Sequence, residues 1–586
     1  MNNYTLNSPA NQQKTPLWVS VQKFLPLLSD QKRQIIIATL AAFLTAGLNL
    51  LAPVLIGHAV DTYIAQGDYH GVLVYAAIIL AIYFGAVVSS YFQTLLMGRV
   101  GQNVLFSLRN AIFTKIQDLP VAFFNQNKAG DLISRINNDT DKLNQFFSQS
   151  LVQFAANIIT ILGAAVFVIS INWKMGLIAV APAVFLLIFT QLLSPWIKRK
   201  NATNLMNIGG MSAEVSESID NFKVVVAFNR RDYFLTRFKE VNETNYTSAI
   251  GAGIANNTLI PTYGFASNTA QLLVIAFGLT FIATGSFTLG LLISFLTYVA
   301  RIYDPLRQMA ALWASFQTAF ASWDRVHAIL ELDTDLLKIP TVEKRPAEYV
   351  MEFKDVSFSY PNGKEVLHHV NLAFEHGKTY ALVGPTGGGK TTTASLIARL
   401  YDPTSGSVFL DGKDIRSYDA QERAQKIGFI LQEPFLFTGT VRENIVYGNA
   451  AYATLNNEEL QQVIAEQGLE TLLSRFEAGL DTELTATGSK LSLGQKQLIA
   501  FVRAMLRRPE LIVLDEATAN IDTVTEQLLD EILKKLPKET TLVIIAHRLN
   551  TIENADEIFF VNSGEVIQAG SMQHAVDMLL HGKRES

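Results

Sequence analysis

A glycine-rich run that begins at Gly384 carries the residue types that bind a nucleoside triphosphate. Its glycines let backbone N–H groups turn inward around phosphates, the Lys390 ammonium can reach the β and γ oxygens, and the Thr391 hydroxyl can ligate Mg²⁺. Apolar residues at 379–383 predict a strand before the run, and residues 391–400 predict a helix after it, so the phosphates would meet a helix N-terminus. The candidate phosphate-binding residues are Gly384, Pro385, Thr386, Gly387, Gly388, Gly389, Lys390, Thr391 and Thr392.

Two acids follow a second apolar run about 120 residues after this loop. The run Leu511–Leu514 predicts a buried strand, Asp515 at its end can hold Mg²⁺ through water, and Glu516 can polarise an attacking water. An apolar strand followed by two acids is weak evidence by itself, but it is strong evidence at this distance from a phosphate loop. The two motifs together predict a site that binds and hydrolyses a nucleoside triphosphate.

Residues 350–580 resemble the ATP-binding cassette family in the order of their motifs. Leu491-Ser-Leu-Gly-Gln495 resembles the family's signature sequence, and residues 519–522, ending at Asp522, resemble the loop between two ATP sites. The resemblance implies ATP and Mg²⁺ as cofactors, with Thr391, Gln432 and Asp515 around the metal. It further implies roles for the remaining site residues: stacking on adenine by Tyr360, catalysis by Glu516 and the switch histidine His547, and a signature formed by Ser492, Leu493, Gly494 and Gln495 that is lent to a partner's ATP site.

Several of these residues have another interpretation when each is taken alone. Tyr360 is then an aromatic at a strand end, Gln432 a solvated loop amide, and His547 a hydrogen-bonded core histidine. Their order and spacing favour the family interpretation.

Apolar residues concentrate before residue 330 and predict a membrane domain. Hydrophobic residues make up 49% of the chain and the mean hydropathy is +0.22. No Lys or Arg occurs at 35–98, and no charged residue at 251–300. A helix needs about 20 apolar residues to cross the roughly 30 Å hydrocarbon core. We therefore expect six spans, at about 35–57, 72–97, 151–171, 175–196, 258–283 and 288–305.

Basic residues flank one side of these spans, whereas the other side holds Asp61, Asp68 and a single Lys174. The positive-inside bias places both termini in the cytosol. Segments 58–71, 172–174 and 284–287 are then external, and the long segments 98–150 and 197–257 are cytosolic. The expected fold is an all-α six-helix transmembrane domain fused to an α/β P-loop NTPase domain, in the inner membrane of a bacterium.

The long cytosolic segments keep helical spacing, which suits spans that continue as helices beyond the bilayer. In the resembled exporters each such segment carries a short transverse helix that touches the ATPase domains. Leu119–Asn125 and Ser218–Ala227 are our candidates for these helices. An ordinary solvated helical hairpin is the alternative.

The expected domains are a disordered N-terminus at 1–15, a transmembrane domain at 16–330, a linker at 331–349 and an ATPase domain at 350–582. Residues 16–28, with Trp18 and Phe24, predict an interfacial helix before the first span. The chain has no cysteine, which excludes disulfides and thiolate metal sites. Its net charge of −5 and the lack of a basic aromatic face argue against a nucleic-acid partner.

Two departures from the family pattern concern an ATP site shared with a partner. In the resembled transporters, ATP lies between the phosphate loop of one ATPase domain and the signature of the other. The usual third signature residue is glycine, but here it is Leu493, and residues 485–490 lack the expected Glu-Arg pair. A side chain at 493 could crowd the backbone that approaches the γ-phosphate. The chain looks similar to the heterodimeric bacterial multidrug exporter subunit that keeps a complete catalytic glutamate; a homodimer that tolerates leucine is the alternative.

Charged and aromatic residues in the spans are candidates for substrate contact. Arg301, Asp304 and Arg307 share roughly one face of a helix beside Pro305, and we favour structural ion pairs below the bilayer over substrate binding for them. An apolar cavity could be lined by Phe84, Tyr91, Phe277, Phe281, Phe295 and Tyr298, although lipid contact or helix packing explains most of them equally well.

The resemblance as a whole implies a half-size exporter that works as a dimer and moves amphipathic drugs, because fusion of the two domains resembles exporters rather than importers. Lipids or lipid-like molecules are the alternative substrates. A regulatory membrane subunit that binds ATP to gate a partner is the alternative function.

Overall fold

The computed structural model describes residues 4–6, 29–334, 336, 338–340, 347–361, 363–485, 491–515, 522–534, 536–545, 554–570, 573–575 and 578, with the side chains of 310 and 523 left aside. Their contacts divide the chain into two units. The first unit comprises residues 9–116 and 130–331 and is helical. The second comprises residues 332–586 together with two earlier pieces, 1–8 and 117–129.

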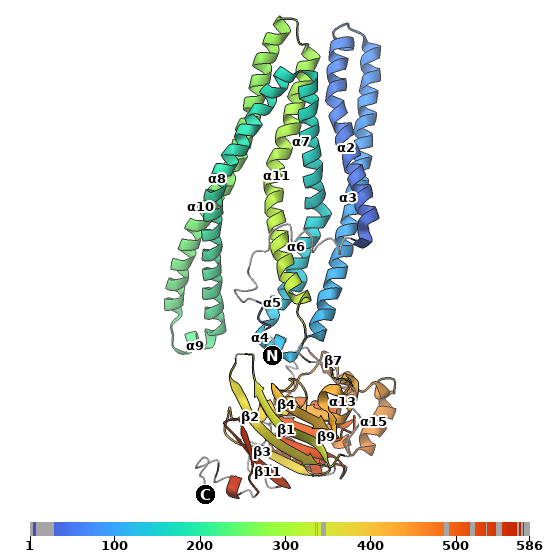
Figure 1. Cartoon of the computed structure of the whole chain (residues 1–586), viewed down its shortest axis with the longest axis vertical. Helices are drawn as coiled ribbons and strands as arrows, with labels where there is room; N and C mark the ends of the chain where they lie inside the picture. The colour runs from blue at the N-terminus through green and yellow to red at the C-terminus, as the bar shows by residue number, and fades with distance from the viewer. Residues whose placement is uncertain are drawn as a thin grey trace. The chain divides into compact units, whose positions relative to one another are not determined.

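Six long helices build the described part of the helical unit (Figure 1), and each contains one candidate membrane span. Their bounds are α2 Lys32–Ala59, α3 Tyr69–Asp118, α7 Leu151–Ile171, α8 Trp173–Asp220, α10 Arg231–Ala283 and α11 Leu289–Leu330. Shorter pieces lie between them: η3 Val60–Ile64, α5 Ala129–Ser134, η4 Arg135–Asp139, α6 Thr140–Gln145, η5 Phe146–Ser150 and α9 Phe222–Ala227. The six predicted spans are therefore confirmed.

Four of the long helices, α3, α8, α10 and α11, extend well past the thickness of a bilayer. Helix α3 has 50 residues, which at 1.5 Å per residue is about 75 Å, against a hydrocarbon core of about 30 Å. Side-chain caps fix two of the outer helix ends, because Asn172 accepts hydrogen bonds from the first N–H groups of α8 and Thr288 accepts one from Leu291 of α11. The prediction that spans continue as helices into the cytosolic segments is confirmed.

The core of the helical unit lies between α11 and its neighbours. Phe295 and Tyr298 on α11 are fully buried, so they are packing residues and do not line an open cavity. The Tyr298 hydroxyl donates to the Leu50 carbonyl of α2, and the Tyr303 hydroxyl donates to the Ala179 carbonyl of α8 at 3.1 Å. These bonds satisfy buried hydroxyls inside an otherwise apolar seam.

The two transverse helices predicted from the sequence differ in extent from those observed. The first is α4, Val121–Gln126, where Leu119–Asn125 was expected. The second is α9, which begins at Phe222 instead of Ser218 because α8 continues without a break to Asp220. Figure 1 shows α9 as the short connection between α8 and α10, which run side by side.

The described residues of the second unit form three sheets. One is antiparallel, in the order β2-β1-β4-β5; the second is six-stranded, in the order β12-β11-β3-β10-β9-β6; and β7 pairs with β8. The six-stranded sheet is parallel except for β12. The strands are β1 Tyr349–Ser359, β2 Glu365–Glu375, β3 Thr379–Val383, β4 Ser405–Leu410, β5 Lys413–Asp414, β6 Ile427–Ile430, β7 Gly439–Thr440, β8 Glu483–Leu484, β9 Leu511–Asp515, β10 Thr541–Ile545, β11 Glu557–Asn562 and β12 Glu565–Gln568.

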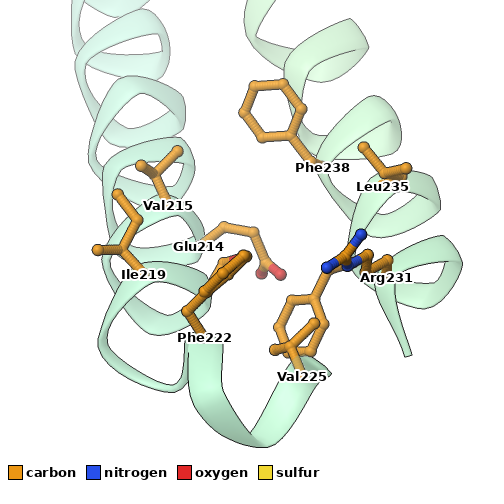
Figure 2. Close-up of a pocket in the computed structure, with 10 residues that line it drawn as sticks. Glu214, Val215, Ile219, Phe222, Val225, Arg231, Leu235 and Phe238 are labelled. Carbon is orange, nitrogen blue, oxygen red and sulfur yellow. The ribbon is translucent and has the colours of Figure 1, made fainter. Parts of the chain in front are cut away.

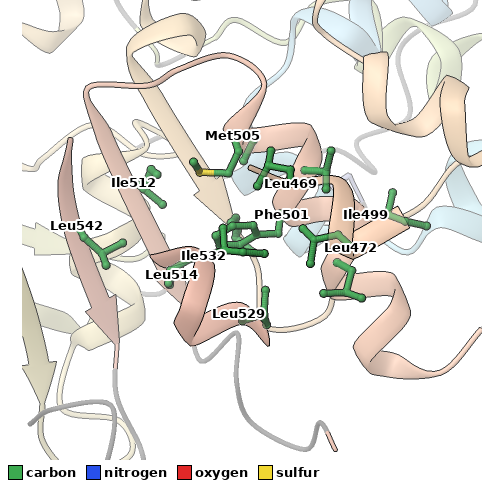
Figure 3. Close-up of a cluster of buried hydrophobic side chains, with 14 of the residues drawn as sticks. Leu469, Leu472, Ile499, Phe501, Met505, Ile512, Leu514, Leu529, Ile532 and Leu542 are labelled. Carbon is green, nitrogen blue, oxygen red and sulfur yellow. The ribbon is translucent and has the colours of Figure 1, made fainter. Parts of the chain in front are cut away.

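Helices of this unit lie beside the six-stranded sheet or pack on one another in the same hydrophobic core. They are α12 Lys390–Ile397, α13 Ala420–Lys426, α14 Val441–Val446, α15 Asn457–Glu466, α16 Glu470–Leu473, α17 Leu493–Met505 and α18 Thr523–Lys534, with short 3₁₀ turns η6 Ile415–Ser417, η7 Ala450–Tyr452 and η8 Gly479–Asp481. Figure 3 shows side chains of α17 and α18, such as Phe501, Leu529 and Ile532, gathered against Ile512 and Leu514 of β9. The strands predicted at 379–383 and 511–514 are confirmed.

Three residues at the N-terminus are packed, although the composition of residues 1–15 predicted disorder. The side chains of Tyr4 and Leu6 are buried, with 1% and 4% of their surface exposed, against the segment that contains α4. The expectation of disorder is therefore wrong for Tyr4–Leu6. The interfacial helix expected at 16–28 lies outside the described residues.

Candidate functional site

The candidate site lies where the parallel strands of the six-stranded sheet end. The glycine-rich loop leaves the carboxyl end of β3, Asp515 is the last residue of β9, and Gln432 follows β6 by two residues. Strand β10 pairs with both β3 and β9, so these ends share one edge of the sheet. Ligands of open α/β sheets bind at this edge. The predicted catalytic residues lie outside the described residues: Glu516 is the next residue after β9, and His547 is the second residue after β10.

The glycine-rich loop is pressed against β11. Gly384 has φ +150°, and a Cβ atom there would lie 2.0 Å from the Val561 carbonyl oxygen. A Cβ atom on Gly388 would lie 2.5 Å from the same oxygen. The loop can approach β11 this closely because these positions carry no side chain.

Lys390 is held inside this loop. Its side chain is buried, and the ammonium donates to the Gly384 carbonyl at 2.7 Å and to the Pro385 carbonyl at 3.1 Å. Because Lys390 is also the first residue of α12, its charge lies at a helix N-terminus that itself favours anions. Helix α12 ends at Ile397, a few residues before the predicted end at 400.

Tyr360 sits at the end of β1 among other aromatic side chains. Its ring makes edge contacts with Phe358 at 4.9 Å and with Tyr401 at 5.5 Å between centroids, and its hydroxyl lies 3.1 Å from Thr392 Oγ1. The predicted adenine-stacking residue and the predicted phosphate-loop residue Thr392 are thus joined by one hydrogen bond. Contact with both fixes the orientation of the Tyr360 ring.

Tyr401 is a residue of this site that the sequence analysis missed. Its hydroxyl accepts a hydrogen bond of 2.7 Å from Asn125 Nδ2 of α4. Burial raises the pKa of the Tyr401 hydroxyl, so it stays protonated. Helix α4 therefore contacts the aromatic group beside the predicted adenine position, a link between segments 276 residues apart that no local pattern reveals.

The residues that the sequence assigns to Mg²⁺ are chemically suited to it. Thr391 is exposed on the first turn of α12, Gln432 is exposed after β6, and Asp515 is buried at the end of β9. Hydroxyl, amide and carboxylate oxygens are the ligands that Mg²⁺ uses in phosphate-binding sites, alongside the phosphates themselves. Among the described residues no group of three His, Cys, Asp or Glu side chains could hold a metal independently of such phosphates.

The signature segment forms the N-terminus of α17. Ser492 caps the helix by accepting from the Gln495 N–H at 3.2 Å, and the Gln495 side chain accepts from the Ser492 N–H at 3.0 Å. Leu493 is partly buried and packs against the hydrophobic core, and Gly494 is buried. The Leu493 side chain is thus part of the packing of its own domain.

Asp522, the end of the predicted loop between two ATP sites, lies next to the signature. A Cβ atom on Gly494 would lie 3.3 Å from Asp522 Oδ2. The carboxylate accepts hydrogen bonds from the Thr525 N–H at 3.0 Å and the Thr525 hydroxyl at 2.6 Å. These two bonds lower the pKa of Asp522 because they favour its ionised form. Residues 519–521 and most of 485–490 lie outside the described residues.

The structural ion pairs that the sequence favoured for Arg301, Asp304 and Arg307 are absent from the described part of the chain. Asp304 is exposed on α11, and none of the three charges has an oppositely charged partner within the described residues. One turn further along, the Gln308 side chain accepts from Gln153 of α7 at 3.0 Å. A polar strip therefore lies on the exposed side of α11.

An apolar pocket of about 300 Å³ lies at the end of the α8–α9–α10 hairpin (Figure 2). Phe222, Ile219 and Phe238 form part of its wall, and the Glu214 carboxylate points into it. One oxygen of Glu214 is bonded to Arg237 at 2.9 Å, whereas the other is buried with no hydrogen-bond donor among the described residues. Large apolar side chains are also exposed around it, including Phe228 with 75% of its surface.

Comparison with known proteins adds two family matches. Residues 35–306 match the ABC transporter transmembrane region, and residues 367–519 match the ABC transporter family of ATPase domains.

Three relatives resemble nearly the whole chain. The uncharacterized ABC transporter ATP-binding protein YfiC of Bacillus subtilis (strain 168) is 32% identical over 94% of this chain and 91% of its own length. The putative multidrug export ATP-binding/permease protein YgaD of the same organism is 30% identical, over 95% of this chain and 97% of its own. The ATP-dependent lipid A-core flippase of Desulfotalea psychrophila (strain LSv54 / DSM 12343) is 32% identical, over 93% and 95%.

Proposed function

Since the chain belongs to the ABC transporter family, as a multi-pass membrane exporter with a cytoplasmic ATPase domain, we propose that it is one subunit of a heterodimeric exporter of amphipathic drugs. ATP binding and hydrolysis coupled to transport follow from the family. The proposal concerns the partner, the residues of the ATP sites and the substrate.

The observation that carries the proposal is the contrast between a phosphate loop of the expected type and a signature with leucine at its third position. The loop, Asp515, Glu516 and His547 would supply one competent ATP site once a partner lends it a glycine-bearing signature. The signature of this chain, which carries Leu493, would in turn contact the ATP bound by the partner. That second site would turn over slowly or not at all.

In the competent site each residue has a distinct task. The Lys390 ammonium, already aimed by the carbonyls of Gly384 and Pro385, would exchange these contacts for the β and γ phosphate oxygens. Mg²⁺ held by Thr391, Gln432 and Asp515 would neutralise phosphate charge. Glu516 would accept a proton from the attacking water, and His547 would stabilise the γ-phosphate. Tyr360, fixed by Thr392 and Tyr401, would stack on adenine.

The need for a partner is supported by exposed apolar surface outside the candidate spans. Phe222 and Phe228, in and just after α9, are more than half exposed, and the ATPase unit exposes Phe435 to 63%. Phe435 lines a groove of about 260 Å³ with Phe437 and Tyr447, close in sequence to Gln432. Exposed aromatic clusters on a cytosolic surface favour association. We infer that α9 docks on the ATPase domain of the second subunit.

The proposed substrate class rests on the exposed side of α11. Asp304 is 15 residues from Leu289, or about 22 Å along the helix, which is within the roughly 30 Å hydrocarbon core. A charged side chain at that depth is costly against lipid, so it faces a partner or a water-accessible cavity. Charged and amide groups beside apolar walls suit molecules that are themselves amphipathic.

Lipid-like molecules remain the second candidate substrate because the relative named as a lipid A-core flippase is as similar as the one named for multidrug export. A regulatory subunit that only binds ATP is less favoured. Such a subunit would not need the hydrolytic residues Lys390, Asp515, Glu516 and His547 together.

The test is to purify the chain alone and together with candidate half-transporters, and to measure ATPase activity with drugs and with lipids. We expect little activity alone, one-to-one co-purification with one partner, and stimulation by amphipathic drugs. A homodimer of this chain that transports drug at full rate in proteoliposomes would contradict the heterodimer.

A further inference from the structure

We propose that the N-terminal peptide of this chain, residues 4–6, is a strap that docks on α4 and holds this helix against the ATPase domain. The strap is a positioning element for coupling between ATP and transport, and in this respect the proposal rests on the proposed function. In this proposal α4 provides a docking surface for residues 4–6 of the same chain.

The first anchor of the strap is the Tyr4 side chain. It is 1% exposed and its ring meets that of Phe123 of α4 edge to face, with 6.4 Å between centroids. Phe123 is itself fully buried. Such aromatic pairs contribute beyond the area that they bury. The Tyr4 ring therefore anchors the N-terminal peptide on Phe123.

Backbone hydrogen bonds give the strap a defined register on α4. The Tyr4 N–H donates to Gln126 Oε1 at 2.9 Å, and the Leu6 N–H donates to Asn127 Oδ1 at 3.1 Å. Asn127 Nδ2 in turn donates to the Tyr4 carbonyl at 2.9 Å. The side chains of Gln126 and Asn127 therefore form hydrogen bonds with the backbone of the peptide. These bonds satisfy backbone polar groups that burial would otherwise leave unpaired.

The strap and the ATPase domain hold nearly opposite faces of α4. Phe123, which meets the Tyr4 ring, is two residues from Asn125, so their side chains lie about 200° apart around the helix. Asn125 donates to the Tyr401 hydroxyl at 2.7 Å, and Tyr401 contacts Tyr360. Helix α4 is clamped between Tyr4 on one side and the aromatic group of the candidate adenine site on the other.

The strap also reaches the segment that follows the last long helix. The Tyr4 hydroxyl donates to the Asp333 carbonyl at 3.1 Å, three residues after α11 ends at Leu330. One side chain thus joins α4, near the end of α3, to the start of the connection between the two units. A residue in this position can limit how far α4 shifts when the nucleotide site changes.

Docking itself is tested by hydrogen exchange on the purified full chain with a C-terminal tag. We expect the amides of Tyr4 and Leu6 to exchange at least about 10-fold more slowly than in the Gln126→Ala/Asn127→Ala double variant, because the acceptors of both amides are then lost. Equal exchange in the two proteins would overturn the docking. This readout needs no transport activity, so it holds or fails independently of the proposed function.

The coupling role is tested by Tyr4→Ala, with Tyr4→Phe as its matched control, in the active complex. We expect Tyr4→Ala to keep the KM for ATP within about 2-fold but to lower drug-stimulated ATPase turnover and drug transport about 5-fold, the size of a modest coupling between sites. Tyr4→Phe keeps the ring on Phe123 and loses the bond to Asp333, so it should retain most of the stimulation.

Two results would count against the coupling role. Full drug stimulation in Tyr4→Ala would show that the strap docks without influencing coupling. An equal loss of basal and stimulated activity, together with a lower Tm, would show a general effect on stability instead. A wild-type complex that fails to transport any amphipathic compound would contradict the proposed function, while the exchange experiment would still decide whether the strap exists.

Discussion

The phosphate loop and the signature segment belong to the same ATPase unit but are built under different constraints. The phosphate loop is enclosed, since Gly384 and Gly388 approach the Val561 carbonyl too closely for any side chain. The signature segment is the capped start of α17, where the Leu493 side chain packs partly into the core of its own domain.

This difference teaches where sequence change is tolerated. A substitution in the enclosed loop alters the backbone that must surround phosphate, so it damages this chain's own ATP site. A leucine at the start of α17 is compatible with the fold of this chain, so under the proposed function its consequence would fall on the ATP bound by a partner.

The largest expected effect is that of Glu516→Gln. The amide keeps the shape of the side chain but accepts a proton poorly, so ATP turnover in the active complex should fall about 10²- to 10⁴-fold while ATP binding survives. Steady-state hydrolysis and nucleotide binding measured side by side check this. Unchanged turnover would move catalysis to the partner and favour a regulatory subunit.

A matched pair of glycines tests the enclosure of the phosphate loop. A methyl group on Gly384 meets the Val561 carbonyl at 2.0 Å, whereas one on Gly387 meets no atom within 4 Å, although both glycines have positive φ. Strain and overlap at Gly384 each cost roughly 1–3 kcal/mol, so Gly384→Ala should weaken ATP binding about 100-fold. Gly387→Ala carries the strain alone and should weaken it about 10-fold. Similar affinities in a nucleotide-binding titration would refute the enclosure.

A much smaller effect is expected from Leu493→Gly. In the proposed heterodimer the change would restore the usual signature residue only at the partner's slow site, so drug transport should change less than about 2-fold. Removal of a partly buried leucine should lower stability modestly, which a melting curve would register. A large gain in ATPase activity would contradict this expectation. It would show that Leu493 limits overall turnover, as it would in a homodimer with two equivalent ATP sites.

The smallest effect concerns the pKa of Asp522. In Thr525→Val the hydroxyl donor is lost while the backbone donor remains, so the pKa of Asp522 should rise toward the ordinary carboxyl range. A lowered carboxyl pKa contributes stability that is present above the unfolded-state value and is lost as the pH falls through the folded-state value. The variant should therefore lose this contribution at a higher pH than the wild type. NMR titration of the Asp522 carboxyl measures the shift, and an unchanged pKa would contradict it.

The parts of the fold that follow from local pattern could be predicted from the sequence. Six apolar runs predicted the six spans, and the runs at 379–383 and 511–514 predicted β3 and β9, because buried parallel strands are continuously apolar. The start of α9 was predicted too early since nothing in the local sequence shows that α8 continues to Asp220.

Contacts between distant segments could not be predicted in the same way. The polar composition of residues 1–15 suggested disorder, yet Tyr4 meets the buried ring of Phe123 and forms hydrogen bonds with the side chains of Gln126 and Asn127. Tyr401 has no motif of its own, and its role beside Tyr360 depends on Asn125. The charges at Arg301, Asp304 and Arg307 suggested ion pairs by spacing, but helical spacing does not specify the distance between side-chain tips. The candidate site residues remain predictions in their chemical roles.

The length of α3 makes it a mechanical lever. Of its roughly 75 Å, about 30 Å crosses the hydrocarbon core and about 45 Å extends beyond it. A tilt of about 10° around a pivot at the membrane surface moves a tip 45 Å away by about 8 Å, close to the distance between two packed helices. Small angular changes within the bilayer thus produce displacements at the cytosolic end that approach the spacing of two packed helices. In the other direction, a movement of that end is reduced to a small tilt within the bilayer.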